Sequence, residues 1–346
     1  MSLFKKFFKN IINDRDRDDD TVTVKGKPKP KYYGTVTPYP NFNASSDASV
    51  LQSAIEARGV DEDVIISVLV KRNNEQRQKI KVVYEASKGE RLAEDLKDAL
   101  RSDLEDVSLA LLMTPAQFDA FQLRRATKGL GTDEEILVEI LATRSNQEIC
   151  EIKRVFKEEY GEELEEVIVS ETSDDFTTAL LAMLKANKSE SMEVDMALAQ
   201  KDAEVLFESG ENTDGVDVSA FINILTARSG PQLSKTFEKY ASVSDVTLPK
   251  ALELELSGDI EDCLIDIVKC SWNKPAFFAE KLHLAMKGHG TCEETLIRVL
   301  VSRSEIDLQK ILEQYRAMYN RSVQEDILED TDGHYQQVLL GICGPY

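Results

Sequence analysis

Long apolar runs, cysteine pairs and a cleavable leader are missing from this sequence. The chain of 346 residues has no stretch of 18 uncharged apolar residues, which a membrane-spanning helix would need. Lys5, Lys6 and Lys9 interrupt the apolar start, so the unbroken core of a secretory signal is absent. The five cysteines contain no C-x-x-C pair, which argues against a disulfide framework. These absences predict a cytoplasmic protein with reduced thiols.

Positive charge and histidine are also scarce. The chain has 42 Lys and Arg against 63 Asp and Glu, a formal net charge of −21. Residues 1–46 carry +4, so the other 300 residues carry −25. Such a body repels nucleic acid and anionic lipid, so any contact with an anionic surface calls for a divalent cation between them. With only three histidines and no nucleophile motif, we predict no catalytic residues and no enzymatic activity.

What the chain does contain is an internal repeat. An arginine in a short polar segment recurs four times, at spacings of 72, 84 and 75 residues. Each arginine has a glycine thirteen residues before it and an aromatic residue twelve residues after it. The arginines are Arg72, Arg144, Arg228 and Arg303, the glycines are Gly59, Gly131, Gly215 and Gly290, and the aromatics are Tyr84, Phe156, Tyr240 and Tyr315. The chain is therefore four copies of one unit of about 70 residues.

Within each copy the pattern of apolar residues is helical. In the second copy, Thr114 and Pro115 begin a helix that runs to Lys128, and the acidic Asp133 begins the next. Asn146 is expected to cap a third helix, and two shorter ones are expected at Leu164–Val169 and Phe176–Leu184. Strand alternation is limited to a doubtful patch at Thr21–Val24. We predict an all-α fold of four helical repeats.

The spacing also places linkers between the copies. Residues 13–46 are rich in Asp, Arg, Lys and Pro, and we expect no packed core there. The extra residues between the second and third copies form a second linker. The predicted segments are a tail over 1–46, repeat 1 over 47–113, repeat 2 over 114–186, a linker over 187–197, repeat 3 over 198–273 and repeat 4 over 274–346.

Two glycine loops carry the chemistry. Residues 127–132 read Thr-Lys-Gly-Leu-Gly-Thr and residues 286–291 read Met-Lys-Gly-His-Gly-Thr, each between two predicted helices. Glycines allow positive φ, which turns backbone carbonyls outward, and hard carbonyl oxygens suit calcium. Forty residues after the second glycine stands Glu171, Glu255 or Asp330 in the last three copies. A single such loop is as well explained as a glycine C-cap, but the recurring acid favours calcium sites.

The first and third copies depart from this pattern. Repeat 1 has Ala99 at the acid's position, but the carbonyls of Gly59 and Val60 with Glu62, which aligns with Glu134 of repeat 2, offer another site. A second arrangement in repeat 1 combines the carbonyls of Lys97 and Leu100 with Glu105. Repeat 3 has a longer loop from Gly210 to Gly215.

These four repeats resemble the annexin family over residues 47–346, as do the segments 116–120, 275–282 and 343–344. The resemblance implies a curved disc of five-helix repeats, with calcium loops on its convex face. It also implies several calcium ions as the cofactor. The ligands implied are the carbonyls of Thr127, Gly129 and Gly131 with Glu171; of Gly210, Thr213 and Gly215 with Glu255; and of Met286, Gly288 and Gly290 with Asp330. Thr132 and Glu134 are counted with the metal site of repeat 2.

The function implied is calcium-dependent binding of anionic phospholipid membranes, with membrane bridging and phospholipase A2 inhibition by substrate sequestration. The protein would be cytoplasmic and peripheral on membranes when calcium rises; the sequence leaves open whether it is exported without a leader. One alternative is a helical protein-interaction scaffold regulated by calcium. Another is an enzyme in which calcium is structural.

The N-terminal segment has one apolar face beside three lysines. This face suits packing on the protein's own core, insertion at a membrane interface or docking in a partner's groove. The resemblance implies a small dimeric EF-hand protein as the partner. The face consists of Leu3, Phe4, Phe7, Phe8, Ile11 and Ile12.

Overall fold

The computed structural model describes residues 21–24, 27–210 and 216–345. The predicted tail helix at Leu3–Ile12 lies outside these described residues. Thr213 and Gly215, which belong to the predicted loop of repeat 3, also lie outside them. The chain divides into two compact units. Unit 1 contains repeat 1 with most of repeat 4, and unit 2, residues 119–277, contains most of repeats 2 and 3.

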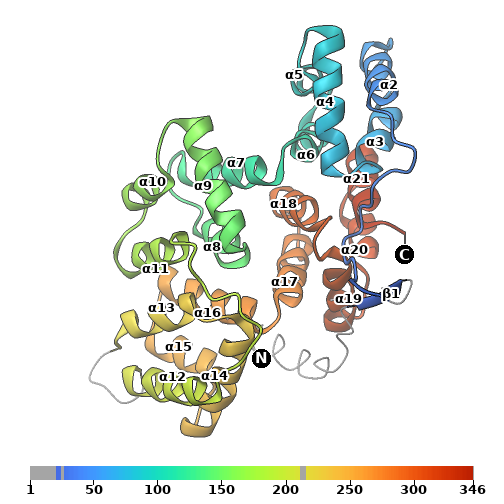
Figure 1. The fold of residues 1–346 in the computed structure, drawn as a ribbon. Helices are drawn as coiled ribbons and strands as arrows, with labels where there is room; N and C mark the ends of the chain where they lie inside the picture. The colour runs from blue at the N-terminus through green and yellow to red at the C-terminus, as the bar shows by residue number, and fades with distance from the viewer. Residues whose placement is uncertain (1–20, 25–26, 211–215, 346) are drawn as a thin grey trace. The chain divides into compact units, whose positions relative to one another are not determined.

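The described residues form twenty helices, five in each repeat, which confirms the all-α prediction (Figure 1). Repeat 1 has α2 (Ala44–Glu56), α3 (Glu62–Val70), α4 (Asn74–Lys88), α5 (Leu92–Ala99) and α6 (Ser102–Leu112). Repeat 2 has α7 (Pro115–Thr127), α8 (Glu134–Thr143), α9 (Asn146–Tyr160), α10 (Leu164–Glu171) and α11 (Asp174–Leu184). Repeat 3 has α12 (Met196–Ser209), α13 (Val218–Ala227), α14 (Gly230–Val243), α15 (Leu248–Glu255) and α16 (Asp259–Trp272). Repeat 4 has α17 (Lys274–Met286), α18 (Glu293–Arg303), α19 (Leu308–Tyr319), α20 (Val323–Asp330) and α21 (Gly333–Cys343).

Helix starts follow local capping chemistry. The side chain of Thr114 accepts a hydrogen bond from the Gln117 backbone N–H, and the Gln117 side chain accepts one from the Thr114 N–H. This reciprocal capping box begins α7 at Pro115, as predicted. The predicted cap of α9 was wrong by one residue, because Ser145 rather than Asn146 forms the capping box with Glu148. The Asn146 side chain instead forms hydrogen bonds with the backbone N–H and carbonyl of Lys188 in the second linker.

The core of each unit lies between two repeats. In unit 1, α21 packs on α3 and α6, and α18 packs on α6. In unit 2, α16 packs on α8 and α11, and α11 packs on α13. The four aromatics that mark the repeats (Tyr84, Phe156, Tyr240 and Tyr315) are all fully buried. Each repeat therefore completes its apolar core against a neighbour, as expected of repeats too small to bury their own apolar faces.

The recurring arginines form ion pairs that the sequence analysis did not find, and three of the four arginines, Arg72, Arg144 and Arg303, are buried. Arg72, Arg144 and Arg228 pair with Asp47, Asp119 and Asp202 at 2.6, 2.8 and 2.7 Å. The aspartate stands 25 or 26 residues before its arginine. In repeat 4 that position is Phe278, whose ring lies 4.6 Å from the guanidinium of Arg303. Arg303 pairs with Asp307 instead, at 2.7 Å.

The expectation that residues 13–46 lack packing is wrong for residues 33–39. Val36 is 3% exposed, and the backbone N–H groups of Thr35 and Val36 donate to the carbonyl of Ser304. Tyr39 exchanges two hydrogen bonds with the side chain of Gln76, and its ring stacks 3.5 Å from the Arg72 guanidinium. This segment straps repeat 4 to repeat 1 within unit 1. Composition did not reveal it because the contacts are made mainly by backbone groups.

The second linker is held in the same way within unit 2. Asp195 exchanges two hydrogen bonds with the side chain of Gln232, matching Tyr39 and Gln76 in both donor pattern and spacing. The N–H of Ser189 donates to the carbonyl of Ala227 at 2.9 Å. N-terminal to residues 33–39, β1 (Thr21–Val24) and β2 (Lys27–Pro30) pair as an antiparallel hairpin. The patch at Thr21–Val24 is therefore a strand.

Candidate metal centre

The two glycine loops have the backbone geometry that the sequence predicted. Gly129 and Gly131 have φ of 142° and 99°, and Gly288 and Gly290 have φ of 114° and 101°. In each loop the residue two places after the second glycine donates its N–H to a carbonyl seven residues earlier, at 2.8 Å. This bond closes the loop tightly between two helices. Side chains are disfavoured at these φ values, which is why glycine is required there.

A threonine holds each glycine loop against the end of a helix about 40 residues away. The Thr132 hydroxyl donates to the backbone carbonyl of Glu171 at 3.1 Å. In repeat 4 the Thr291 hydroxyl donates to the carbonyl of Asp330 at 3.0 Å and to its carboxylate at 2.5 Å. Glu171 ends α10 and Asp330 ends α20. The structure thus brings Glu171 and Asp330 beside the predicted loops in repeats 2 and 4, and in repeat 4 the carboxylate itself contacts the loop threonine.

The glycine carbonyls of these loops are unpaired among the described residues. Those of Gly129, Gly131, Gly288 and Gly290 accept no hydrogen bond from any described residue. Thr127 and Met286 end α7 and α17, so their carbonyls belong to the last helical turn, where intrahelical donors run out. Unpaired carbonyl oxygens next to a carboxylate are the donor set that calcium prefers. The residues present therefore fit a calcium ion.

Repeat 3 is only partly visible. Gly210 follows α12 directly and has a negative φ. Glu255 is exposed at the end of α15, in the place that Glu171 and Asp330 occupy at the ends of α10 and α20. Since Thr213 and Gly215 are not described, the loop of this repeat remains a prediction.

In repeat 1 the predicted acid already has a partner from repeat 4. Gly59 has φ of 75°, and Glu62 begins α3 directly after Asp61 and Val60. The Glu62 carboxylate lies 2.6 Å from Nδ1 of His334. Nothing in the spacing of the sequence links Glu62 to His334, so this contact was missed. A cation at this loop has to compete with the imidazole for the carboxylate.

The second arrangement in repeat 1 also has a competitor. The guanidinium of Arg101 donates to the Leu100 carbonyl at 2.7 Å and to the Asp98 carbonyl at 2.6 Å. Lys97 lies in the last turn of α5, and Glu105 lies in the first turn of α6. A positive side chain thus occupies one of the predicted carbonyl ligands.

A residue with positive φ recurs three residues after the position at which repeats 2 to 4 carry their predicted acidic ligand. Ser102, Asp174, Gly258 and Gly333 each stand three residues after the position of Ala99, Glu171, Glu255 or Asp330, and have φ of 54°, 56°, 73° and 61°. Two of the four are not glycine, although positive φ is costly for other residues. The same backbone turn is therefore kept in all four repeats. Sequence alone hid it because serine and aspartate give no glycine signal.

No group of three or more His, Cys, Asp or Glu side chains suited to a metal occurs among the described residues. The candidate sites rest on backbone carbonyls with one carboxylate each. Within the described ranges, no helix is long and apolar enough to cross a membrane.

Comparison with known proteins agrees with this geometry. A profile of the Annexin family matches residues 46–111, 118–183, 201–267 and 277–342. The chain belongs to the annexin family. Human Annexin A1 is 54% identical to this annexin over 309 residues, or 89% of each chain, and bovine Annexin A1 is 53% identical over the same length. The predicted resemblance of the chain to annexin I, or lipocortin, is thus confirmed.

Solved annexin structures share the fold. A structure titled annexin III has a TM-score of 0.89 and 44% identity, covering 91% of this chain and 98% of that one. Chicken annexin V in complex with Zn²⁺ has a TM-score of 0.86 and 43% identity, covering 91% and 99%. Calcium-bound annexin (Sm)1 has a TM-score of 0.81 and 30% identity, covering 92% and 94%.

Proposed function

We propose that this annexin binds anionic phospholipid membranes through calcium ions held in its glycine loops. The observation that carries the proposal is the pairing of unpartnered loop carbonyls with Glu171 in repeat 2 and Asp330 in repeat 4. Three carbonyls and one carboxylate leave positions open in the six- to eight-fold coordination of calcium, and a lipid phosphate can fill them. The ligands proposed are Thr127, Gly129, Gly131 and Glu171; Gly210, Thr213, Gly215 and Glu255; and Met286, Gly288, Gly290 and Asp330.

Exposed apolar side chains beside the loops support a membrane as the partner. Leu130, at the tip of the first loop, is fully exposed. Val169 and Leu328 are 56% and 47% exposed, two residues before Glu171 and Asp330 in the chain, and Leu254 is 62% exposed, one residue before Glu255. Large apolar residues exposed beside charged ones suit the boundary between headgroups and acyl chains.

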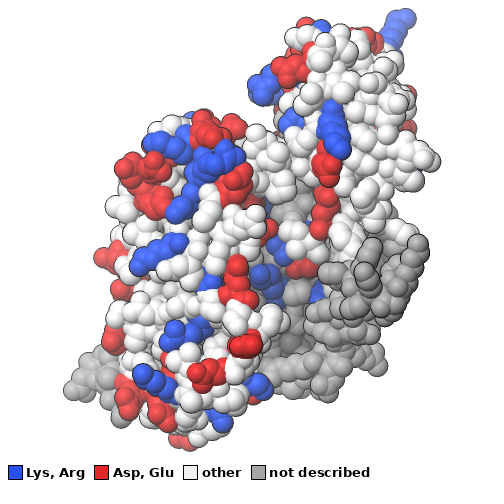
Figure 2. Space-filling model, viewed as in Figure 1, with Lys and Arg blue, Asp and Glu red and all other residues white. Residues whose placement is uncertain are grey.

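Surface charge explains why calcium is needed. Figure 2 shows acidic and basic side chains intermixed over the described residues of the face in view. Many of the basic groups are engaged, as in the ion pairs Arg154–Glu151 and Lys153–Glu165 at 2.6 and 2.7 Å. With a net charge of −21, the protein is repelled by anionic lipid until bound cations reverse the local sign.

Co-sedimentation with vesicles tests this function. We expect the full chain to pellet with phosphatidylserine vesicles in calcium and to return to the supernatant when a chelator is added. Phosphatidylcholine vesicles are the control, since they lack net negative charge. Calcium affinity measured by calorimetry should rise when phosphatidylserine is present, because each ligand raises the affinity for the other. Calcium-independent pelleting, or equal calcium affinity with and without lipid, would contradict the proposal.

Repeat 1 offers a gain-of-affinity test. Replacing Arg101 by Gln removes the cation that contacts the carbonyls of Asp98 and Leu100. Because like charges disfavour each other, we expect the variant to bind one more calcium ion, or to bind its weakest one about three- to tenfold more tightly. Calorimetry of the full chain measures this, with Lys71→Gln as a charge control, because Lys71 is exposed and lies at the end of α3 away from the Gly59 loop. An unchanged isotherm would show that the predicted arrangement of Lys97, Leu100 and Glu105 does not bind calcium.

The finer functions rest on the family resemblance. We propose that several loops on one chain allow bridging of vesicles, and that coverage of lipid inhibits phospholipase A2 by withholding its substrate. The protein would then be cytoplasmic and would move to membranes when calcium rises. The N-terminal segment, residues 1–12, is proposed to engage a second membrane or a small dimeric EF-hand protein. Its three lysines would each contribute about 1 kcal/mol near an anionic surface.

A further inference from the structure

A surface pocket of about 420 Å³ lies in repeat 4, within unit 1. This volume is in the range of pockets that hold small ligands. Its walls come from α19, from the start of α20 and from the end of α21, and α20 packs on the other two helices (Figure 1). The lining residues that matter for its chemistry are Leu312, Glu313, Arg316, Gln324 and Cys343.

The pocket lies where repeats 1 and 2 place a lysine. In those repeats Lys81 and Lys153 stand three residues before the aromatic residue that marks the repeat, and each ammonium donates at 3.0 Å to the last carbonyl of the fifth helix. In repeat 4 the matching residue is Leu312, which cannot donate, and the matching carbonyl is that of Cys343. No described residue donates a hydrogen bond to the Cys343 carbonyl. An open acceptor therefore stands at a helix C-terminus, where a cation is favoured.

Gln324 is a buried carboxamide without a partner. It is 5% exposed and lines the pocket, and its side chain forms no hydrogen bond with any described residue. A carboxamide has two donor and two acceptor positions, and it is costly to bury such a group unpaired. The pocket is therefore suited to a ligand that both donates and accepts hydrogen bonds.

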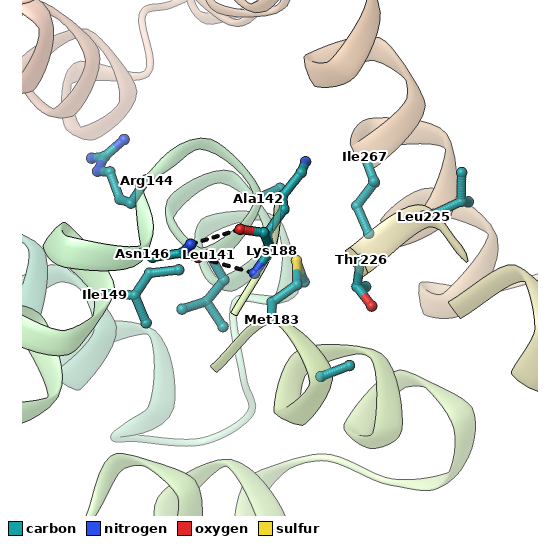
Figure 3. A pocket seen from close by; sticks show the side chains of 11 residues that line it. Leu141, Ala142, Arg144, Asn146, Ile149, Met183, Lys188, Leu225, Thr226 and Ile267 are labelled. Atoms are coloured by element: carbon teal, nitrogen blue, oxygen red, sulfur yellow. Dashed lines mark hydrogen bonds between the residues drawn. The ribbon is translucent and has the colours of Figure 1, made fainter. Parts of the chain in front are cut away.

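Other carboxamides of this chain show what such a group binds. The side chain of Gln76 accepts a hydrogen bond from the N–H of Tyr39 and donates one to its carbonyl, at 2.9 and 3.0 Å. Figure 3 shows the same pairing of Asn146 with the N–H and the carbonyl of Lys188, at 3.2 and 2.7 Å. In both cases the partner is the backbone of a segment outside the helices. Gln324 is therefore suited to hold the backbone of an extended peptide.

The charged groups of the pocket suit the end of a peptide. The guanidinium of Arg316 is exposed and forms no ion pair with any described residue. The pKa of nearby Glu325 is lowered first by the Ser322 N–H, which its carboxylate accepts at 2.6 Å, and more weakly by Arg316. The start of α20 adds a partial positive charge, so a carboxylate is favoured beside Arg316. Glu313 and the open carbonyl of Cys343 favour a basic side chain in the same ligand.

We propose that this pocket binds the C-terminal end of a peptide that has a basic residue just before its last residue. Arg316 holds the terminal carboxylate, and Gln324 pairs with the last backbone amide. The basic side chain takes the place that Lys81 and Lys153 occupy in repeats 1 and 2, and an apolar last side chain packs on Leu312. A peptide end supplies all these groups within two residues, which suits a pocket of this size. The site is separate from the glycine loops and needs no calcium.

Calorimetry of the full chain with a synthetic peptide tests the proposal. The probe is N-acetyl-Gly-Ala-Lys-Leu with a free carboxylate, measured in a calcium chelator. We expect saturable binding of one peptide per chain. The same peptide with a C-terminal amide should bind about tenfold more weakly or worse, because it lacks the charged partner of the guanidinium. Norleucine in place of the peptide's lysine should cause a similar loss.

Variants of the protein assign the binding to this pocket. Arg316→Gln should weaken binding of the free-carboxylate peptide about tenfold and leave binding of the amide unchanged, because the two changes remove the same interaction. Gln324→Met keeps the size of the side chain and should weaken both peptides. Lys71→Gln is the charge control, since Lys71 is exposed and lies outside the pocket. Arg316 is exposed, so its replacement is expected to leave the fold intact, which circular dichroism checks.

A crystal structure of the complex should place the peptide's carboxylate on Arg316 and its last amide on Gln324. Absence of binding, equal binding of the free-carboxylate and amide peptides, or natural affinity in Arg316→Gln would overturn the assignment. None of these outcomes bears on calcium-dependent membrane binding, because the measurement is made without calcium or lipid.

Discussion

Replacing Glu171 and Asp330 together by glutamine is expected to raise the calcium concentration for half-maximal vesicle binding by tenfold or more. Each substitution removes the carboxylate that we propose as a calcium ligand beside a loop whose other proposed donors are neutral carbonyls. The loss of one charged ligand costs about 1.5–3 kcal/mol, and each 1.4 kcal/mol is about tenfold in affinity. Because the loops act together on one membrane, the two losses compound. Vesicle co-sedimentation over a calcium series measures the midpoint.

Glu166 provides a matched control for this experiment. It lies on α10, as Glu171 does, and is exposed, but it stands five residues before the loop contact. Glu166→Gln removes the same charge and should leave the midpoint within about twofold, since exposed charges at a distance are screened by salt. If the double variant and the natural chain have the same calcium midpoint for vesicle binding, Glu171 and Asp330 are not calcium ligands.

Replacing Asp119 by Ala is expected to lower the free energy of unfolding by about 3–5 kcal/mol. Asp119 accepts two hydrogen bonds from Arg144, and both residues are under 10% exposed. Burial alone would lower the pKa of Arg144, but Asp119 raises it overall, so the arginine stays charged. The variant leaves that charge buried without its partner. Urea unfolding of the full chain, followed by circular dichroism, measures the change.

A second variant distinguishes the stranded charge from a simple cavity. Asp119→Leu combined with Arg144→Met removes both charges and refills the space with apolar atoms, which often restores stability at such sites. We expect the pair to recover most of the loss. Were the double variant as unstable as Asp119→Ala, the hydrogen bond from Arg144 to the Thr143 hydroxyl would matter more than the unpaired charge.

The recurrence of residues in the sequence was enough to predict the four repeats and the two glycine loops. Positive φ at Gly129 and Gly131 follows from residue type, since only glycine adopts such angles readily. The 40-residue offset to Glu171 placed a carboxylate near the loop because each repeat folds into the same five helices. The Asp–Arg pairs could have been predicted in the same way, because the 25- or 26-residue spacing between the two residues recurs in three repeats. Phe278 breaks that spacing before Arg303, which obscured it.

The sequence by itself determined the helices, their order and the two complete glycine loops, because these depend on local backbone preferences and on spacing within one repeat. Only the tertiary structure decided which groups compete for the sites of repeat 1. His334 reaches Glu62 from another repeat, and Arg101 turns back onto the carbonyl of Leu100. The packing of Val36 was decided in the same way. Such contacts join positions far apart in the chain or depend on side-chain direction, and neither periodicity nor composition carries that information.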